Sequence, residues 1–296
     1  MADTQSPIGS RRRLGAELRR LRTKSKLTLD EVAERMTCST SKISRLETGK
    51  GIPKVPDVSE LMRIYGVASD TERDMLLRLV RDGREHGWWE SYTDGVPAEK
   101  YFLDDPGRYA SLESDASAVR SFDLTVLHGL LQTPGYGRAV MRSVLPHHTA
   151  AEIDRLVGMR QYRQAALRRE VPAPLEITAV VDEGLLQRPV GGPGVMVEQL
   201  DRLLAVDELP NVTLLVLPFN VGVLRAHAGH FALLEIPSAR GSDVVYAEGL
   251  AGNSYLDAEP DVALYGEVFD EVLAHALPPA ESRAVITDYR SRHVHC

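Results

Sequence analysis

The polar side chains between residues 40 and 45 have types and a spacing that suit contact with a nucleic acid. They are hydroxyl groups and cations, at Thr40, Ser41, Lys42, Ser44 and Arg45. Ile43 and Leu46 are apolar and three residues apart, so one face of a helix would be buried and the polar side chains would cover the rest. Hydroxyl groups and cations bind base edges and phosphates. The stretch therefore predicts a helix that lies in the major groove of DNA.

A second predicted helix precedes it and would hold it in place. Thr28 and Glu31 have the spacing of a capping box, in which each side chain binds the other residue's backbone N–H. Ser39 is placed to cap the following helix, and Gly49 to end it. Two short helices joined by a tight turn are typical of a helix-turn-helix that binds DNA. An ordinary helical hairpin is the alternative that the spacing leaves open.

The distribution of charge favours the DNA-binding interpretation. Residues 1–54 hold 13 Lys and Arg against 6 Asp and Glu, whereas the other 242 residues hold 22 against 36. The net charge of −7 thus combines a basic N-terminal segment with an acidic remainder. A basic segment neutralises phosphates and releases counterions, so DNA binding is expected there.

The same patterns predict an all-α N-terminal domain of five helices over residues 10–86. Pro53 and Pro56 predict a loop after the second motif helix. Residues 1–9 are expected to be a disordered lead. The helices outside the motif are predicted at residues 10–24, 57–65 and 70–86.

A chain of 296 residues with 43% apolar residues is large enough for about two domains. Residues 87–126 are rich in aromatic residues and turn formers, and we expect a connecting segment there. Residues 127–296 mix strands with helices, which predicts a larger α+β domain. Its strands are predicted at residues 175–183, 212–219, 230–237 and 243–249, and its helices at 149–170, 197–209, 261–276 and 279–290.

No pattern in the C-terminal domain predicts catalysis, a metal or a cofactor, and we expect no enzyme. Asp182 and Glu183 are adjacent carboxylates, which fit a helix N-terminus better than acid–base catalysis. The glycines of residues 191–194 lack the Lys and Ser or Thr of a phosphate-binding loop. His227 and His230 lie in a predicted loop, with a spacing more typical of surface histidines than of a metal site.

Arginines along the helix predicted at residues 149–170 form a candidate surface for an acidic partner or an anionic ligand. They include Arg155, Arg160, Arg163 and Arg168. A solvated helix face with local ion pairs is the alternative interpretation.

The cysteines and the apolar runs predict a cytoplasmic protein. Cys38 and Cys296 are far apart in the sequence, and we expect no disulfide between them. No apolar run approaches the ~18 residues of a membrane span. The first residues lack the apolar stretch of a signal peptide.

The N-terminal domain resembles the Xre/Cro-type helix-turn-helix family, through Thr28, Glu31 and Ala33 and through the run Ile-Ser-Arg-Leu-Glu-x-Gly that ends at Gly49. The resemblance implies that Thr40, Ser41 and Arg45 reach bases, with Lys42 and Ser44 beside them. It further implies that Lys50 and Lys54 touch phosphates and that Arg22 pairs with Glu47. Leu29 departs from the family, many members of which have a glutamine there that contacts the backbone phosphate or a neighbouring base-reading residue.

Residues 90–290 resemble the C-terminal domain of WhiJ-like regulators of filamentous actinobacteria. The matching segments include residues 129–139, 182–193 and 209–219. This resemblance implies a cytoplasmic transcriptional regulator that often works with a small acidic partner protein.

Our first hypothesis is a DNA-binding transcription factor whose motif helices approach phosphates at their N-termini, near Thr28 and Ser39. One domain buries little DNA, so a homodimer that reads two half-sites is expected. The alternative is that the C-terminal domain is a small-molecule sensor or an enzyme that the N-terminal domain localises to DNA. Docking of a partner protein is a further possibility.

Overall fold

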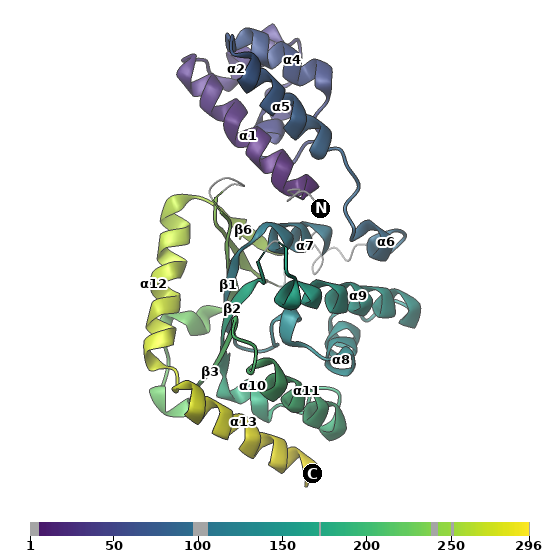
Figure 1. Ribbon diagram of the computed structural model, residues 1–296, viewed down its shortest axis with the longest axis vertical. Helices are drawn as coiled ribbons and strands as arrows, with labels where there is room; N and C mark the ends of the chain where they lie inside the picture. The colour runs from purple at the N-terminus through teal and green to yellow at the C-terminus, as the bar shows by residue number, and fades with distance from the viewer. Residues whose placement is uncertain (1–5, 97–105, 172, 238–241, 250–251, 296) are drawn as a thin grey trace. The chain divides into compact units, whose positions relative to one another are not determined.

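The computed structural model describes residues 6–96, 106–171, 173–237, 242–249 and 252–295 (Figure 1). It divides into two compact units, which are described separately. The N-terminal unit comprises Met1–Trp88 with Pro237–Ser242, and the C-terminal unit comprises Trp89–Ile236 with Asp243–Cys296.

The N-terminal unit is all-α, which confirms the predicted fold class. Within its described residues the helices are α1 (Pro7–Lys24), α2 (Leu29–Arg35), α3 (Thr40–Glu47), α4 (Val55–Ile64) and α5 (Asp70–Asp82). Apolar residues at helical spacing on all five form one core. Its fully buried members include Leu18, Val32, Ile43, Val58, Leu61, Leu76 and Val80.

Two helices begin earlier than the sequence predicts, and each has a proline in its first turn. α1 begins at Pro7, capped by Ser6, so residues 7–9 do not belong to a disordered lead. Residues 1–5 of that predicted lead are outside the described residues. α4 begins at Val55 with Pro56 as its second residue, so the predicted loop through Pro56 is wrong. The first N–H groups of a helix have no helical partner, and proline is tolerated there for that reason.

Two backbone positions fix α3 against the rest of the unit. Thr37, in the turn between α2 and α3, has φ +49°, a left-handed conformation that β-branched residues rarely adopt. Gly15 of α1 lies against the end of α3, since a Cβ built there would be 2.6 Å from the carbonyl oxygens of Leu46 and Glu47. Glycine therefore allows α1 to cross α3 closely.

The C-terminal unit is α+β, as predicted, and contains a mixed sheet. In its described residues the strand order is β3-β2-β1-β4-β5-β6. β1, β2 and β3 are parallel to one another, whereas β4 is antiparallel to β1 and β5 is antiparallel to both β4 and β6. The strands are β1 (Ala118–Asp123), β2 (Glu176–Asp182), β3 (Val212–Leu217), β4 (Phe231–Glu235), β5 (Val244–Ala247) and β6 (Ser254–Leu256).

Helices cover both faces of this sheet (Figure 1). On one face Phe269 of α12 packs with Phe122 and Val180. On the other face Leu200 of α11 packs with Ala179. The helices and 3-10 turns are α6 (Glu90–Thr93), α7 (Pro106–Asp115), η1 (Gly129–Leu131), α8 (Pro134–Val144), α9 (Ala150–Arg163), η2 (Gln164–Arg168), α10 (Glu183–Gln187), α11 (Pro193–Val206), η3 (Phe219–Val221), η4 (Arg225–Ala228), α12 (Glu259–His275) and α13 (Pro279–Val294).

The main difference from the sequence prediction is β1. It lies within residues 87–126, the predicted connecting segment, yet it pairs with β2 on one side and β4 on the other. Its residues Arg120, Ser121 and Asp123 interrupt the apolar pattern of a buried strand, which explains why the pattern did not indicate one. None of the described helices is both long and apolar enough to cross a membrane.

Candidate functional sites

The helix-turn-helix is formed by α2 and α3, and α3 presents its polar residues outside the core. Ile43 and Leu46 of α3 are 0% and 6% exposed and pack in the core of the N-terminal unit. The side chains predicted to contact DNA are solvent-accessible: Ser39, Ser41, Lys42 and Arg45 are exposed, and Thr40 and Ser44 are half-buried. The helix thus has the buried and accessible faces that reading a groove requires.

Two of these side chains already have partners on neighbouring helices. The Thr40 hydroxyl donates a 2.7 Å hydrogen bond to Oδ1 of Asp30 in α2. Lys42 Nζ lies 2.9 Å from Oδ1 of Asp57 in α4. In contrast, the Arg45 guanidinium makes no hydrogen bond or ion pair within the described part of the chain. Arg45 is therefore the cation of α3 that is available to a base edge without breaking an internal contact.

The remaining residues predicted to contact DNA lie at the ends of helices. Thr28 caps α2, and the predicted capping box is present: the Glu31 N–H donates to the Thr28 hydroxyl at 3.2 Å, and the Thr28 N–H donates to Glu31 Oε2 at 2.7 Å. The hydrogen bonds from Thr28 lower the pKa of Glu31. Lys50 and Lys54 are exposed, between α3 and α4.

Arg22 and Glu47 form a bidentate ion pair between α1 and the end of α3. Arg22 Nε and Nη2 donate to the two carboxylate oxygens of Glu47 at 2.7 and 2.9 Å. Arg22 Nη1 also donates to the Leu27 carbonyl oxygen at 2.9 Å. The side chains are 14% and 6% exposed. The hydrogen bond to Glu47 raises the pKa of Arg22.

The arginines predicted as one surface on residues 149–170 do not lie on one surface. α9 ends at Arg163, and Arg168 is exposed on the 3-10 turn η2 that follows. Arg155 donates to the Asp94 carbonyl oxygen at 2.6 Å. Arg160 and Arg163 line an internal cavity instead.

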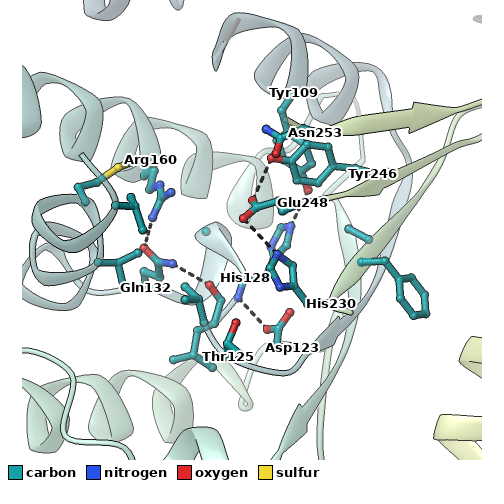
Figure 2. Close-up of a pocket in the computed structure, with 18 of the residues that line it drawn as sticks. Tyr109, Asp123, Thr125, His128, Gln132, Arg160, His230, Tyr246, Glu248 and Asn253 are labelled. Atoms are coloured by element: carbon teal, nitrogen blue, oxygen red, sulfur yellow. Dashed lines mark hydrogen bonds and ion pairs between the residues drawn. The ribbon is translucent and has the colours of Figure 1, made fainter. Parts of the chain in front are cut away.

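This cavity, of about 480 Å³, lies at the carboxyl end of β1, where the parallel half of the sheet meets the antiparallel half (Figure 2). Asp123 ends β1, His230 precedes β4, and Glu248 follows β5. Its volume is within the range of small-molecule sites, ~300–1,000 Å³. Apolar side chains of α8 and α9 form one wall: Val140, Met141, Val144, Leu156 and Met159.

Arg160 reaches the cavity from α9 and is held by Gln132 (Figure 2). Its Nη1 donates to Gln132 Oε1 at 2.7 Å, and Gln132 Nε2 donates to the Leu127 carbonyl oxygen at 2.7 Å. Burial lowers the pKa of Arg160, although guanidinium stays protonated in proteins. One turn further on, Arg163 is paired with both carboxylate oxygens of Glu113 at 2.8 and 2.6 Å.

The opposite wall is polar, and its groups are bound to one another. His230 Nε2 lies 3.1 Å from Glu248 Oε2, and the Tyr246 hydroxyl donates to Glu248 Oε1 at 2.9 Å. The hydrogen bond to Glu248 raises the pKa of His230. The Tyr109 hydroxyl lies 2.6 Å from His128 Nε2.

Asp123 and His128 are titratable groups that line the cavity, the first buried and the second half-buried. The backbone N–H of His128 donates to Asp123 Oδ2 at 2.7 Å. Burial raises the pKa of Asp123 to about 7 and lowers the pKa of His128 to about 3. Desolvation disfavours the charged form of each side chain, so both pKa shifts favour the neutral form.

The other residues considered from the sequence have structural roles. Asp182 caps α10 through the Gly184 N–H at 2.8 Å. Glu183 accepts a hydrogen bond from the Tyr289 hydroxyl at 2.9 Å. His227 lies 3.5 Å from Asp182 rather than beside His230. Across the described residues no group of His, Cys, Asp and Glu has the arrangement of a metal site.

The sequence did not single out most of the cavity. Asp123, Gln132, Tyr246 and Glu248 come from segments far apart in the chain. Asp123 lies at the carboxyl end of β1, where polar residues often line ligand sites, but the sequence pattern did not indicate this strand.

Two family models match the chain. A model described as a helix-turn-helix domain matches residues 13–76, and a domain of unknown function, DUF5753, matches residues 106–288. No curated protein and no solved structure matches. The first match confirms the predicted helix-turn-helix, a type of domain that binds DNA. The second covers more than half of the chain, and the chain therefore belongs to the DUF5753 family, with a helix-turn-helix domain at its N-terminus.

Proposed function

We propose that the protein is a sequence-specific transcriptional regulator of the Xre type that reads DNA with α3. The observation that carries this proposal is the accessible polar side of α3, where the Arg45 guanidinium has no partner among the described residues, while Ile43 and Leu46 hold the helix from behind. Arginine binds guanine O6 and N7 with two hydrogen bonds, and this is the commonest base-specific contact.

In this proposal the other predicted residues contact phosphates or add hydroxyl groups in the groove. Lys50 and Lys54 neutralise phosphates beside the groove, and the N-termini of α2 and α3, near Thr28 and Ser39, approach the backbone. Lys42 exchanges its contact with Asp57 for a phosphate. Thr40, Ser41 and Ser44 are within the same accessible stretch and contribute hydroxyl groups.

A homodimer that reads two half-sites about one helical turn apart, ~34 Å, remains our prediction for the assembly. The WhiJ-like grouping and the cytoplasmic location also remain predictions, because the matched families name neither.

The proposal is tested by selection from a pool of random duplexes with the full chain. A sequence-specific regulator enriches a defined consensus, and a two-fold symmetric consensus with half-sites one turn apart supports the dimer. Recovery of unenriched sequences at low salt, where phosphate contacts alone give binding, would contradict sequence-specific reading.

We also propose that the C-terminal unit is regulatory rather than catalytic, and that it senses a small molecule. The cavity of small-molecule size with a cation at its wall favours sensing. Docking of a small acidic protein on the arginines of α9 has less support, because Arg160 and Arg163 face the cavity. A change in DNA affinity on ligand binding would require two states of the protein that bind DNA differently.

A further inference from the structure

Of Arg160, Arg163 and His230, which line the cavity, Arg160 is the one without a carboxylate partner among the described residues. Arg163 is paired with Glu113, and His230 is paired with Glu248. Arg160 has a neutral partner, the Gln132 carboxamide oxygen, and no ion pair with any described residue. A guanidinium has five N–H donors, so most of those on Arg160 are left for another acceptor.

Gln132 is fixed and therefore holds Arg160 in one orientation. The residue is 2% exposed, its side-chain Nε2 donates to the Leu127 carbonyl oxygen, and its backbone carbonyl oxygen accepts from the side chains of Gln161 and Gln164 at 3.2 and 2.6 Å. A cation that is oriented in this way before binding loses little conformational entropy when an anion arrives.

The acidic residues of the cavity leave little negative charge for a cationic ligand. Glu248 is engaged by His230 and by the Tyr246 hydroxyl. Asp123 accepts from the backbone N–H of His128 and is 4% exposed, and burial disfavours its charged form. The lining therefore favours an anion over a cation.

The wall beside Arg160 is apolar. Leu156 and Met159 of α9, with Val140, Met141 and Val144 of α8, line the cavity next to it. Burial of the ligand's apolar surface there would contribute most of the affinity. The Arg160 cation would fix the orientation of the ligand and select anionic molecules.

We infer that the cavity binds a small organic molecule with one anionic group on an apolar body, and that Arg160 holds the anionic group. This inference rests on the sensor role proposed above, and it names the class of ligand. A charge-assisted hydrogen bond in this setting is expected to change affinity by at least about tenfold.

The test compares two fluorescent probes on the full chain without DNA. One is 1-anilinonaphthalene-8-sulfonate, an aromatic body with one sulfonate, and the other is N-phenyl-1-naphthylamine, the same ring system without it. We expect one sulfonate probe per chain, bound at least about tenfold more tightly than the neutral probe. In Arg160→Gln the preference disappears while the neutral probe binds as before. Arg168→Gln, which removes an exposed arginine outside the cavity, binds both probes like the unsubstituted chain.

A competition experiment keeps the test decisive if Arg160→Gln does not fold. Octanoate should displace the sulfonate probe from the unsubstituted chain at least about tenfold better than octanamide. Equal displacement, equal binding of the two probes, or full retention of the preference in Arg160→Gln would overturn the inference. DNA affinity measured with saturating sulfonate probe separates the proposed sensor role from the proposed ligand class. An unchanged DNA affinity counts against the sensor role and leaves the ligand class supported.

Discussion

Arg22 and Glu47 join the end of α1 to the end of α3, so this ion pair helps to set the angle of the proposed recognition helix. Both side chains are largely withdrawn from solvent. Removal of one partner leaves the other charge without compensation, and that penalty is larger than the net contribution of the pair.

We therefore predict that Arg22→Met and Glu47→Leu each lower the free energy of unfolding by about 3 kcal/mol, and that the double variant costs clearly less than the sum. Urea unfolding of the four proteins measures the coupling. The exposed pair Glu60 and Arg63 is the control, and its cycle should give a coupling far smaller than that of Arg22 and Glu47. Additive losses at Arg22 and Glu47 would contradict a compensating pair.

Asp123 gives a pH prediction whose sign follows from burial. Its pKa is about 7 in the folded chain and ~3.9 when unfolded. Between these values the folded state binds more protons, so this carboxyl lowers stability as pH rises. His128, whose pKa falls to about 3, has the opposite effect below its ordinary pKa.

Asp123→Asn removes the pH dependence that Asp123 contributes and retains the one that His128 contributes. The stability of the variant minus that of the unsubstituted chain should rise from pH ~4 to ~7, by at most about 1.4 kcal/mol per pH unit, and then level off. Urea unfolding of both proteins across this range is the measurement. The contribution of His128 is common to both and cancels. A difference that is flat or falls with pH would contradict a raised pKa at Asp123.

At the level of the helices, the close crossing of α1 and α3 depends on Gly15. A methyl group there would meet the carbonyl oxygens of Leu46 and Glu47, which cannot move without shifting α3. We predict that Gly15→Ala lowers the free energy of unfolding by about 1–3 kcal/mol and weakens DNA binding, despite the better helix propensity of alanine.

Gly266→Ala in α12 is the matched control, because a Cβ built there has no atom within 4 Å among the described residues outside its own stretch of helix. It should be neutral or stabilising by up to about 1 kcal/mol. Urea unfolding compares the two substitutions, and equal stability of both variants would show that the close approach at Gly15 carries no cost.

The elements of the N-terminal unit could be predicted because their signals are local. The capping box at Thr28 and Glu31 and the apolar spacing of Ile43 and Leu46 lie within a few residues of one another. β1 has no such signal, since its position at the centre of the sheet depends on pairing with β2 and β4, more than 50 residues away in sequence.

The cavity could not be predicted either, because it also depends on contacts between residues far apart in the sequence. Arg160, Arg163 and His230 are recognisable in the sequence as charged or titratable residues, but their spacing predicts an outer surface for the arginines. Their turn toward the cavity depends on packing against Gln132, Glu113 and the sheet, and helical spacing carries no information about such contacts.

At the scale of the whole molecule, the chain combines a basic N-terminal segment with an acidic remainder. The basic segment gives affinity for any duplex, whereas sequence preference must come from side chains that reach base edges. The central claim is that Arg45 reads bases and Lys50 contacts a phosphate.

The most direct test measures dissociation constants of the unsubstituted chain, Arg45→Ala and Lys50→Ala for the selected duplex and a scrambled duplex at several salt concentrations. We predict that Arg45→Ala loses about 1–3 kcal/mol on the selected duplex and much less on the scrambled one. Lys50→Ala should weaken both alike and reduce the salt slope by about one. Equal losses on both duplexes for Arg45→Ala would contradict base reading by α3.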